Sequence, residues 1–561
     1  MENKNENVNF TEEQQQVINH KTGNLLVSAS AGSGKTKVLI AKIVDYILND
    51  YAKLKDILVV TFTNDASQEI KSRLSNEISS SQKEKLLAQL DDLSTSDILT
   101  FDKFCIKVIR EFGYKIGINA NFGVCDAGMS NFFQSKALDN VLAKHNKNFD
   151  ANFAHVLDFF YDSRSIEQLK VNIINLYSFL RSKSVEIDHY KNLLNETYSQ
   201  NFNDNIITRF YNEKLLETAN YYKAEIKKLL VDAQAINSTN ICEVLNGSIG
   251  LLSSFGSDVE ENIKLLSLGN SLETIGTRKL DDNEKLIADK YGALRADCNK
   301  RLAVFAGCFG QIGIDQVKKD LSSSKNILLG ILNLIEEFDI EYQKTKKNYA
   351  VLDFADLEKL ANVILQDQTI SNELKNKYKY IFIDEYQDTN DMQESIIKNI
   401  TTGENLCMVG DVKQSIYRFR QAEPKIFVNK YRLYKDMQNG KVIELNKNFR
   451  SRAGVLEFAN LVFDKIMTEK TADLDYEHTA ELECGIKNED VGRVEVIVLN
   501  KPQRQKSEVV KECDVYSVKN AEMTFDGTTQ IQKEAFVVAK KIKELVGSEI
   551  YDAKIKAKRT V

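Results

Sequence analysis

A glycine-rich segment near the start of the chain, Ala29–Thr36, has the residue types that bind phosphate groups. It follows the apolar run Leu25–Val27 and precedes an apolar-periodic stretch from Val38 to Leu48, which predicts the order strand, loop, helix. Backbone N–H groups and the helix dipole favour anions at a helix N-terminus. These features together disfavour a chance glycine-rich turn. We therefore expect a phosphate-binding loop formed by Ala29, Ser30, Ala31, Gly32, Ser33, Gly34, Lys35 and Thr36.

Two residues of this loop have distinct expected roles. Lys35 would reach the outer phosphates of a nucleotide, and the Thr36 hydroxyl would bind the accompanying Mg²⁺ ion. The first glycine of the general pattern is replaced by Ala29, so the segment is a variant of that pattern.

Two adjacent carboxylates, Asp384 and Glu385, end the apolar run Ile381–Ile383. At the carboxyl edge of a parallel sheet, such a pair can complete the chemistry of a phosphate loop. Asp384 is suited to holding Mg²⁺, and Glu385 to orienting or deprotonating a water molecule. An isolated acidic strand end is usually a solvated turn, but the companion loop favours the functional interpretation.

A segment that alternates aromatic and basic residues follows a further apolar strand that ends at Asp411. Aromatic stacking on bases, combined with positive charge near phosphates, binds single strands of nucleic acid. We expect Gln414 to sense the outer phosphate, and Tyr417, Phe419 and Arg420 to contact a strand. A buried aromatic pair with surface arginines explains the segment equally well when it is considered alone.

Arg450 follows the predicted strand Val442–Leu445. An arginine at such a strand end can neutralise charge on a transferred phosphoryl group. Without the rest of the site, a surface ion pair would be the more common explanation.

Apolar periodicity divides the chain into four parts. Strands and helices alternate in residues 1–112, residues 113–345 have mostly helical spacing, and alternation returns in 346–435 and 436–561. The last part includes a predicted strand at Arg493–Val498 and a predicted helix from Gln530 to Val546. These patterns indicate an α/β fold with a long helical insertion.

Bulk composition excludes several classes of protein. The chain has 561 residues and a net charge of −6, so a nucleic-acid surface would have to be local. Its eight cysteines form no CxxC pair and its five histidines form no metal-spaced cluster, which favours reduced structural thiols. The N-terminus differs from a signal peptide, and the longest apolar run is too short to span a bilayer. We expect a cytoplasmic protein without a membrane segment.

The order of these segments resembles that of superfamily 1A DNA helicases of the UvrD/Rep/PcrA type. Phe10–Gln15 resembles the Q motif, in which Gln14 would read adenine, and Lys37 follows the phosphate loop where the family often has a basic residue. Phe62, Thr63 and Asn64 resemble motif Ia, which contacts single-stranded DNA. The equivalent of motif Ib departs from the family, because Asp102 and Lys103 replace its usual histidine and serine.

The later motifs strengthen this resemblance. Asp384–Asn390 resembles motif II, Gly410–Arg420 motif III, and Asn448–Ser451 motif IV, where Arg450 would bind the γ-phosphate. The long helical insertion and the wording of motif III make the chain most similar to the AddA family of helicase–nuclease proteins. The set of motifs is highly specific for the superfamily and less specific for AddA.

The resemblance implies a RecA-like P-loop domain with a parallel sheet (1A) at residues 1–112 and 346–435. A helical 1B insertion would occupy residues 113–345, and a second RecA-like domain (2A) would start within 436–561. ATP and Mg²⁺ would bind between 1A and 2A, and Lys35, Glu385, Gln414 and Arg450 would act on ATP. Single-stranded and duplex DNA would be substrates, with 3′→5′ movement, and an AddB-like protein would be the partner in double-strand break repair and recombination.

In the family, motifs V and VI and a nuclease domain lie beyond the position equivalent to Val561. We therefore expect a fragment that binds ATP and Mg²⁺ but hydrolyses ATP slowly. Two alternatives stay open. One is a stand-alone repair or defence helicase without a nuclease, and the other is an ATP-gated DNA-binding module without helicase activity. An ATPase that acts on protein is disfavoured by the aromatic and basic segment.

Overall fold

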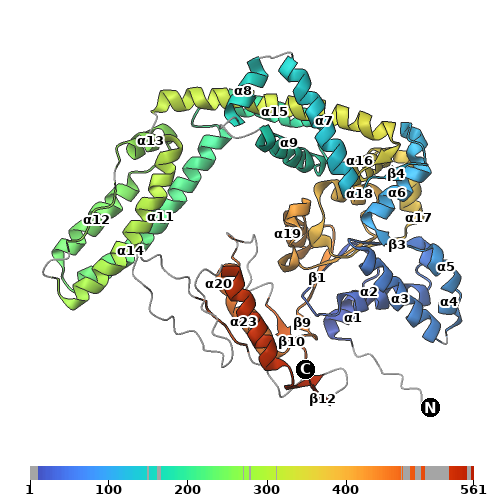
Figure 1. The fold of residues 1–561 in the computed structure, drawn as a ribbon. Helices are drawn as coiled ribbons and strands as arrows, with labels where there is room; N and C mark the ends of the chain where they lie inside the picture. Colours follow the sequence, from blue (N-terminus) through green and yellow to red (C-terminus); the bar gives the residue numbers. More distant parts are fainter. Residues whose placement is uncertain are drawn as a thin grey trace. The chain divides into compact units, whose positions relative to one another are not determined.

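The chain divides into two compact units, which are described separately (Figure 1). The computed structural model describes residues 10–81, 83–147, 151–160, 166–269, 271–276, 280–310, 313–468, 471, 481–486, 494–499, 530–552 and 557–560. Unit 1 comprises Met1–Arg450 and Phe463–Gly485, and unit 2 comprises Ser451–Val462 and Ile486–Val561. The expected functional residues all lie in unit 1.

A parallel sheet of six strands forms the centre of unit 1, in the order β3-β2-β6-β7-β1-β8. Residues of β1 alternate between two hydrophobic cores, because successive side chains of a strand point to opposite faces. Both faces are therefore covered, as is usual for parallel sheets. The strands are β1 (Leu25–Ala29), β2 (Ile57–Thr61), β3 (Asp97–Thr100), β6 (Tyr380–Ile383), β7 (Leu406–Gly410) and β8 (Lys441–Leu445).

Helices cover the two faces of this sheet. One core includes residues of α1 (Glu12–Asn19), α2 (Lys35–Leu48) and α3 (Asn64–Ser80). The opposite core is built by five other helices. These are α6 (Phe101–Phe112), α16 (Phe354–Leu365), α17 (Gln368–Lys377), α18 (Asp391–Ile400) and α19 (Pro424–Lys435). The expected α/β fold with a parallel P-loop sheet is confirmed.

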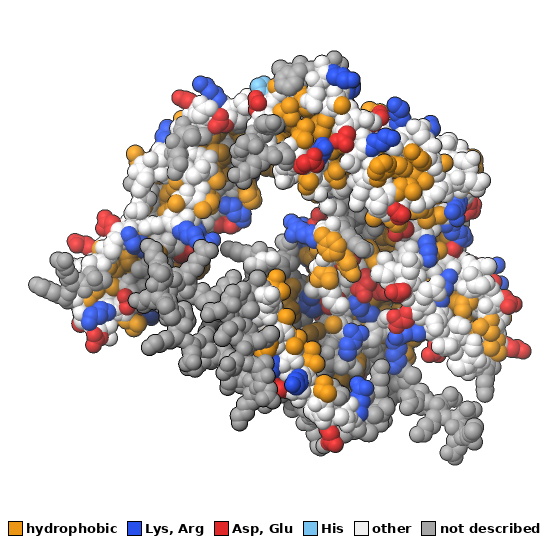
Figure 2. Space-filling model, in the orientation of Figure 1, with side chains coloured by type: hydrophobic (Ala, Val, Ile, Leu, Met, Phe, Trp, Pro, Cys, Tyr) orange, Lys and Arg blue, Asp and Glu red, His pale blue; other side chains and the backbone are white. Residues whose placement is uncertain are grey.

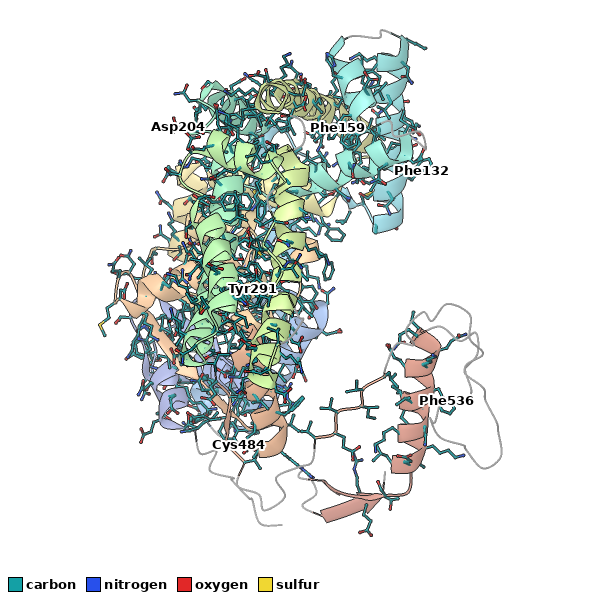
Figure 3. The ribbon with its side chains drawn as sticks, turned by 90° about the vertical axis from the view of Figure 1, so that its left-hand side faces the viewer. Phe132, Phe159, Asp204, Tyr291, Cys484 and Phe536 are labelled. Atoms are coloured by element: carbon teal, nitrogen blue, oxygen red, sulfur yellow. The ribbon has the colours of Figure 1, made fainter. Side chains whose placement is uncertain are left out.

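A helical insertion runs from α7 (Ala127–Lys147) to α15 (Ile314–Asn348). It leaves the sheet after β4 (Gly123–Val124) and returns at β5 (Val351–Leu352), and these two short strands pair in parallel. The insertion has two hydrophobic cores of its own, and one of them surrounds Tyr291, labelled in Figure 3. The helices between its ends are α8 (Ala151–Phe160), α9 (Ile166–Arg181), α10 (Ile187–Ser199), α11 (Ile206–Ala235), α12 (Thr239–Ser253), α13 (Val259–Ser267) and α14 (Asp282–Phe305).

The end of α9 connects the insertion to the sheet-forming part. Arg181 Nη2 lies 2.6 Å from Oδ1 of Asp356 in α16, and both residues are buried. Lys183 lies 2.7 Å from Asp391 at the start of α18. Paired, buried charges of this kind fix one arrangement of the elements that carry them, because separating them would leave an uncompensated charge.

Two expectations about the last part of the chain need correction. The strand Lys441–Leu445 lies in the first sheet, where it pairs with β1, so that sheet extends beyond the expected boundary between residues 435 and 436. Residues 494–499 form no strand, whereas position 493 lies outside the described residues. The predicted helix is present as α23 (Gln530–Leu545). Among the described residues, no helix combines the length and apolar character needed to cross a membrane.

Candidate functional site

The predicted phosphate loop connects the end of β1 to the start of α2. Gly32 and Gly34 adopt φ angles of +70° and +84°, a region that side chains other than glycine disfavour. A Cβ atom on Gly32 would also lie 2.8 Å from Cβ of Arg450. Gly34 is the N-cap of α2 and has no side chain to occupy the N–H groups of the first turn. The loop therefore presents backbone donors at a helix N-terminus, which is the geometry of an anion site.

The expected lysine and the expected carboxylates meet beside this loop. Lys35 Nζ lies 3.1 Å from Oε2 and 3.3 Å from Oε1 of Glu385. Asp384 is buried, and its Oδ1 accepts a hydrogen bond of 3.1 Å from the Glu385 backbone N–H. Burial and the neighbouring Glu385 charge raise the pKa of Asp384 to about 6. Glu385 itself has a φ of +53°, so the carboxylate pair occupies a sharp backbone turn.

Ser33 indicates that the loop is built for a ligand. Its hydroxyl is buried and lacks a hydrogen-bond partner among the described residues. Buried polar atoms are usually satisfied, so an orphaned hydroxyl inside a phosphate loop fits a bound phosphate. Thr36 and Asp384 can offer oxygen ligands to Mg²⁺, but the described residues contain no cluster of three metal-binding side chains. A magnesium ion would therefore need phosphate oxygens and waters as its other ligands.

Gln14 attaches α1 to the phosphate loop. Its Nε2 donates to the Ser33 carbonyl at 2.9 Å, and its Oε1 accepts from the Thr11 backbone N–H at 3.0 Å. One amide N–H and one lone pair are left for a base, so the adenine-reading role stays a prediction. Lys37 lies over the ring of Phe10, 5.4 Å from its centroid.

A chain of hydrogen bonds leads from Glu385 to the segment after β7. Gln387 Nε2 donates to Oε2 of Glu385 at 2.8 Å, and Oε1 of Gln387 accepts from the Asp411 backbone N–H at 2.9 Å. Gln414 Nε2 in turn donates to Oδ2 of Asp411 at 2.7 Å. The sequence suggested a role for Gln414 but not for Gln387, which joins the two ends of this chain.

The residues expected to bind a strand lie after β7 and β2. The rings of Tyr417 and Phe419 are 5.6 Å apart, and Phe419 is 73% exposed, which excludes the buried aromatic pair. Figure 2 shows hydrophobic side chains next to Lys and Arg side chains near α19, which starts shortly after Phe419. Phe62 is half-buried at the end of β2, and Thr63 and Asn64 are exposed at the start of α3. The side chain of Arg420 lies outside the described part of the structure.

Asn448 holds the predicted motif IV segment against the phosphate loop. Its Nδ2 donates to the Ala31 carbonyl at 2.7 Å, and the Phe449 backbone N–H donates to the Gly32 carbonyl at 2.9 Å. The Arg450 backbone N–H donates to Oδ1 of Asn448 at 2.7 Å. Arg450 is thereby placed beside the loop, as expected. Sequence analysis missed the role of Asn448, for which its place directly after a strand was the only signal.

Fold and site together define a P-loop nucleotide-binding domain. Residues 10–247 and 271–435 match the family model of the UvrD/REP helicase N-terminal domain, so the chain belongs to this family.

Several similar proteins are named as the AddA component of an ATP-dependent helicase/nuclease. The chain is 32% identical to the protein of this name from Carboxydothermus hydrogenoformans, over 98% of this chain and 47% of that protein. It is 31% identical to the protein of the same name from Clostridium novyi, over 99% and 47% of the two chains. The match to the Ligilactobacillus salivarius protein is 30% identical, over 97% and 46%. The chain thus spans about half the length of the relatives it matches.

Proposed function

We propose that this chain binds and hydrolyses ATP as part of a DNA helicase. The observation that carries this proposal is the Lys35–Glu385 pair beside the phosphate loop, connected through Gln387 to the segment that bears Tyr417 and Phe419. A P-loop ATPase without a nucleic-acid substrate has no need for an exposed aromatic pair at this position. Membership of the helicase family supports the same function.

Each residue of the site has a step to perform when ATP binds. Lys35 would exchange the Glu385 carboxylate for a phosphate oxygen, which frees Glu385 to orient and deprotonate the attacking water. Thr36 and Asp384 would hold Mg²⁺, which neutralises developing charge on the phosphates. Gln414 would contact the outer phosphate, and Arg450 would offset charge on the transferred phosphoryl group. Gln14 and Lys37 would bind the nucleoside end.

Strand binding is proposed at the same edge of the sheet. Tyr417 and Phe419 would stack on bases, whereas Phe62, Thr63, Asn64 and Arg420 would contact the strand from nearby loops. Because parallel strands end at one edge, the loops after β2, β6 and β7 all lie on the side of the nucleotide. ATP binding and strand binding can therefore influence one another over short paths.

The relatives' name suggests a wider setting. We propose that the chain is the motor part of a cytoplasmic helicase–nuclease that acts in double-strand break repair, moves 3′→5′ and works with a second, AddB-like protein. Residues 113–345 would form its 1B insertion within a 1A domain. Sequence similarity to proteins named as components of an ATP-dependent helicase/nuclease supports this assignment.

Fluorescent ATP binding tests the nucleotide part of the proposal. Wild-type chain should bind N-methylanthraniloyl-ATP in the presence of Mg²⁺, and Lys35→Ala should weaken binding by roughly tenfold or more, because a hydrogen bond to a charged group is lost. Lys425→Ala is the matched control, since Lys425 is exposed on α19 and lies outside the site. Equal binding by wild type and Lys35→Ala would contradict the assignment of the phosphate loop.

A further inference from the structure

A second lysine, Lys413, reaches the phosphate loop from the segment after β7. Its Nζ lies 2.9 Å from Oδ1 of Asp411 and 3.5 Å from the hydroxyl of Ser30. The side chain is only 12% exposed. Strand pairing explains this proximity, because β7 and β1 are parallel neighbours with Gly410 opposite Ser28. The chain segments that follow these two positions must therefore leave the sheet side by side.

Lys413 and Lys35 have closely similar surroundings. Each ammonium is paired with a carboxylate that follows a strand: Glu385 follows β6, and Asp411 follows β7. Each also lies next to the loop that joins β1 to α2. The site therefore has two lysine–carboxylate pairs on neighbouring strands, and only the first is explained by the phosphate-loop pattern.

Asp411 does not depend on the Lys413 ammonium for its hydrogen bonds. Its Oδ2 accepts from Gln414 Nε2 at 2.7 Å, and its Oδ1 accepts from the Lys413 backbone N–H at 3.2 Å. If the ammonium moved to another anion, this buried carboxylate would keep two donors. The ammonium has three donors and two partners at most, so it can bind a further acceptor.

We propose that Lys413 is a second phosphate-binding lysine, which donates to the outermost phosphate of a nucleoside triphosphate. This inference rests on the proposed binding of ATP at Lys35. A diphosphate lacks that outer phosphate, so Lys413 distinguishes ATP from ADP. Because Lys413 precedes Gln414 and lies four residues before Tyr417, its movement towards the phosphate carries the state of the nucleotide into the strand-binding segment.

Comparison of ATP and ADP affinities tests this role. The dissociation constants of N-methylanthraniloyl-ATP and its ADP counterpart would be measured with Mg²⁺ for wild type, Lys413→Ala, Lys413→Met and Lys413→Arg. Removing the charge should weaken ATP binding by roughly tenfold to a hundredfold, as expected for a charged hydrogen bond, and leave ADP binding within about twofold. Lys413→Arg should retain most of the preference for ATP, and Lys425→Ala should behave as wild type.

A lysine that only balances the Asp411 charge gives a different pattern. Loss of its charge would then change ATP and ADP affinities equally, or not at all, and either result would overturn the inference. Lys413→Met keeps the aliphatic stem, so it separates loss of charge from loss of packing, and circular dichroism verifies its fold. Failure of wild type to bind either nucleotide would refute the proposed function itself, a result distinct from a failure at Lys413.

Discussion

The ammonium of Lys35 lies 3.1 Å from Oε2 of Glu385, although the two residues are 350 positions apart in the chain. The Lys35 side chain is 14% exposed and that of Glu385 is 36% exposed, so water screens this pair only in part. The residue expected to bind phosphate is thus neutralised by the residue expected to activate water. Nucleotide binding must separate them, which releases each group for its own task only when ATP is present.

The first prediction concerns Glu385→Gln. This change removes the partner of Lys35 without removing a phosphate ligand, so ATP should bind as tightly as in wild type or more tightly. Hydrolysis should fall by roughly 10²- to 10⁴-fold, the usual contribution of a general base. Fluorescent ATP binding and phosphate release in a single turnover measure the two effects. An unchanged hydrolysis rate would assign the activation of water to another residue.

The second prediction concerns Gln387, a buried side chain that bonds both Glu385 and Asp411. Gln387→Ala should leave ATP affinity within about threefold, since it touches no proposed phosphate ligand except through Glu385. The affinity for single-stranded DNA should lose its dependence on nucleotide. Fluorescence anisotropy of a labelled oligothymidine measures this, with Gln368→Ala, on exposed α17, as the control. Intact coupling in Gln387→Ala would show that another path connects the two sites.

The third prediction concerns Asn448. Asn448→Ala removes a hydrogen bond to the Ala31 carbonyl and another from the Arg450 backbone. Loss of two such bonds should lower the free energy of unfolding of unit 1 by about 1–3 kcal/mol and weaken ATP binding, because the loop loses its support. Urea denaturation and fluorescent ATP titration are the measurements, with Asn446→Ala in the same segment as the control. Equal effects of the two substitutions would contradict this role.

The fourth prediction is a pH dependence at Glu358, in α16. This carboxylate accepts hydrogen bonds from Asn390 at 3.1 Å and Gln393 at 2.7 Å, yet burial raises its pKa from 4.5 to about 7. The folded chain therefore keeps a proton that the unfolded chain releases above pH 4.5. Stability must decrease as the pH rises from there to about 7, by an amount of order 1–3 kcal/mol.

Glu358→Gln isolates this effect, because it cannot release a proton. Wild-type and variant free energies of unfolding would be compared by urea denaturation at roughly pH 5 and pH 8. The wild type should lose stability relative to the variant as the pH rises. A difference that is the same at both pH values would contradict the raised pKa.

Local patterns were sufficient to predict the elements that carry the site. The apolar run before Ala29 is a strand, α2 begins at Lys35, and the strand Leu406–Gly410 has the predicted bounds. Each depends on residues next to one another in the chain, so burial and helix-start signals identify them. The pairing of Lys35 with Glu385 could also be expected, because both follow strands of one parallel sheet.

Contacts that depend on the order of strands could not be predicted. Hydrophobic periodicity shows that Val442–Leu445 is a strand, but it does not show that this strand lies beside β1. The roles of Gln387, Lys413 and Asn448 follow from that order, since each contacts a residue on a neighbouring strand or loop. The run Val494–Val498 has strand-like residue types, yet such propensity alone does not supply a pairing partner.

The central claim is that ATP bound at Lys35 controls strand binding at Tyr417 and Phe419. Its most direct test is the affinity of wild-type chain for labelled oligothymidine with saturating Mg²⁺–ATPγS, with ADP and without nucleotide. We predict affinities that differ by roughly fivefold or more between the triphosphate and ADP states, in the range typical of coupled sites, and no difference for Lys35→Ala. Equal strand affinity in all three states, in a chain that demonstrably binds ATPγS, would contradict the account.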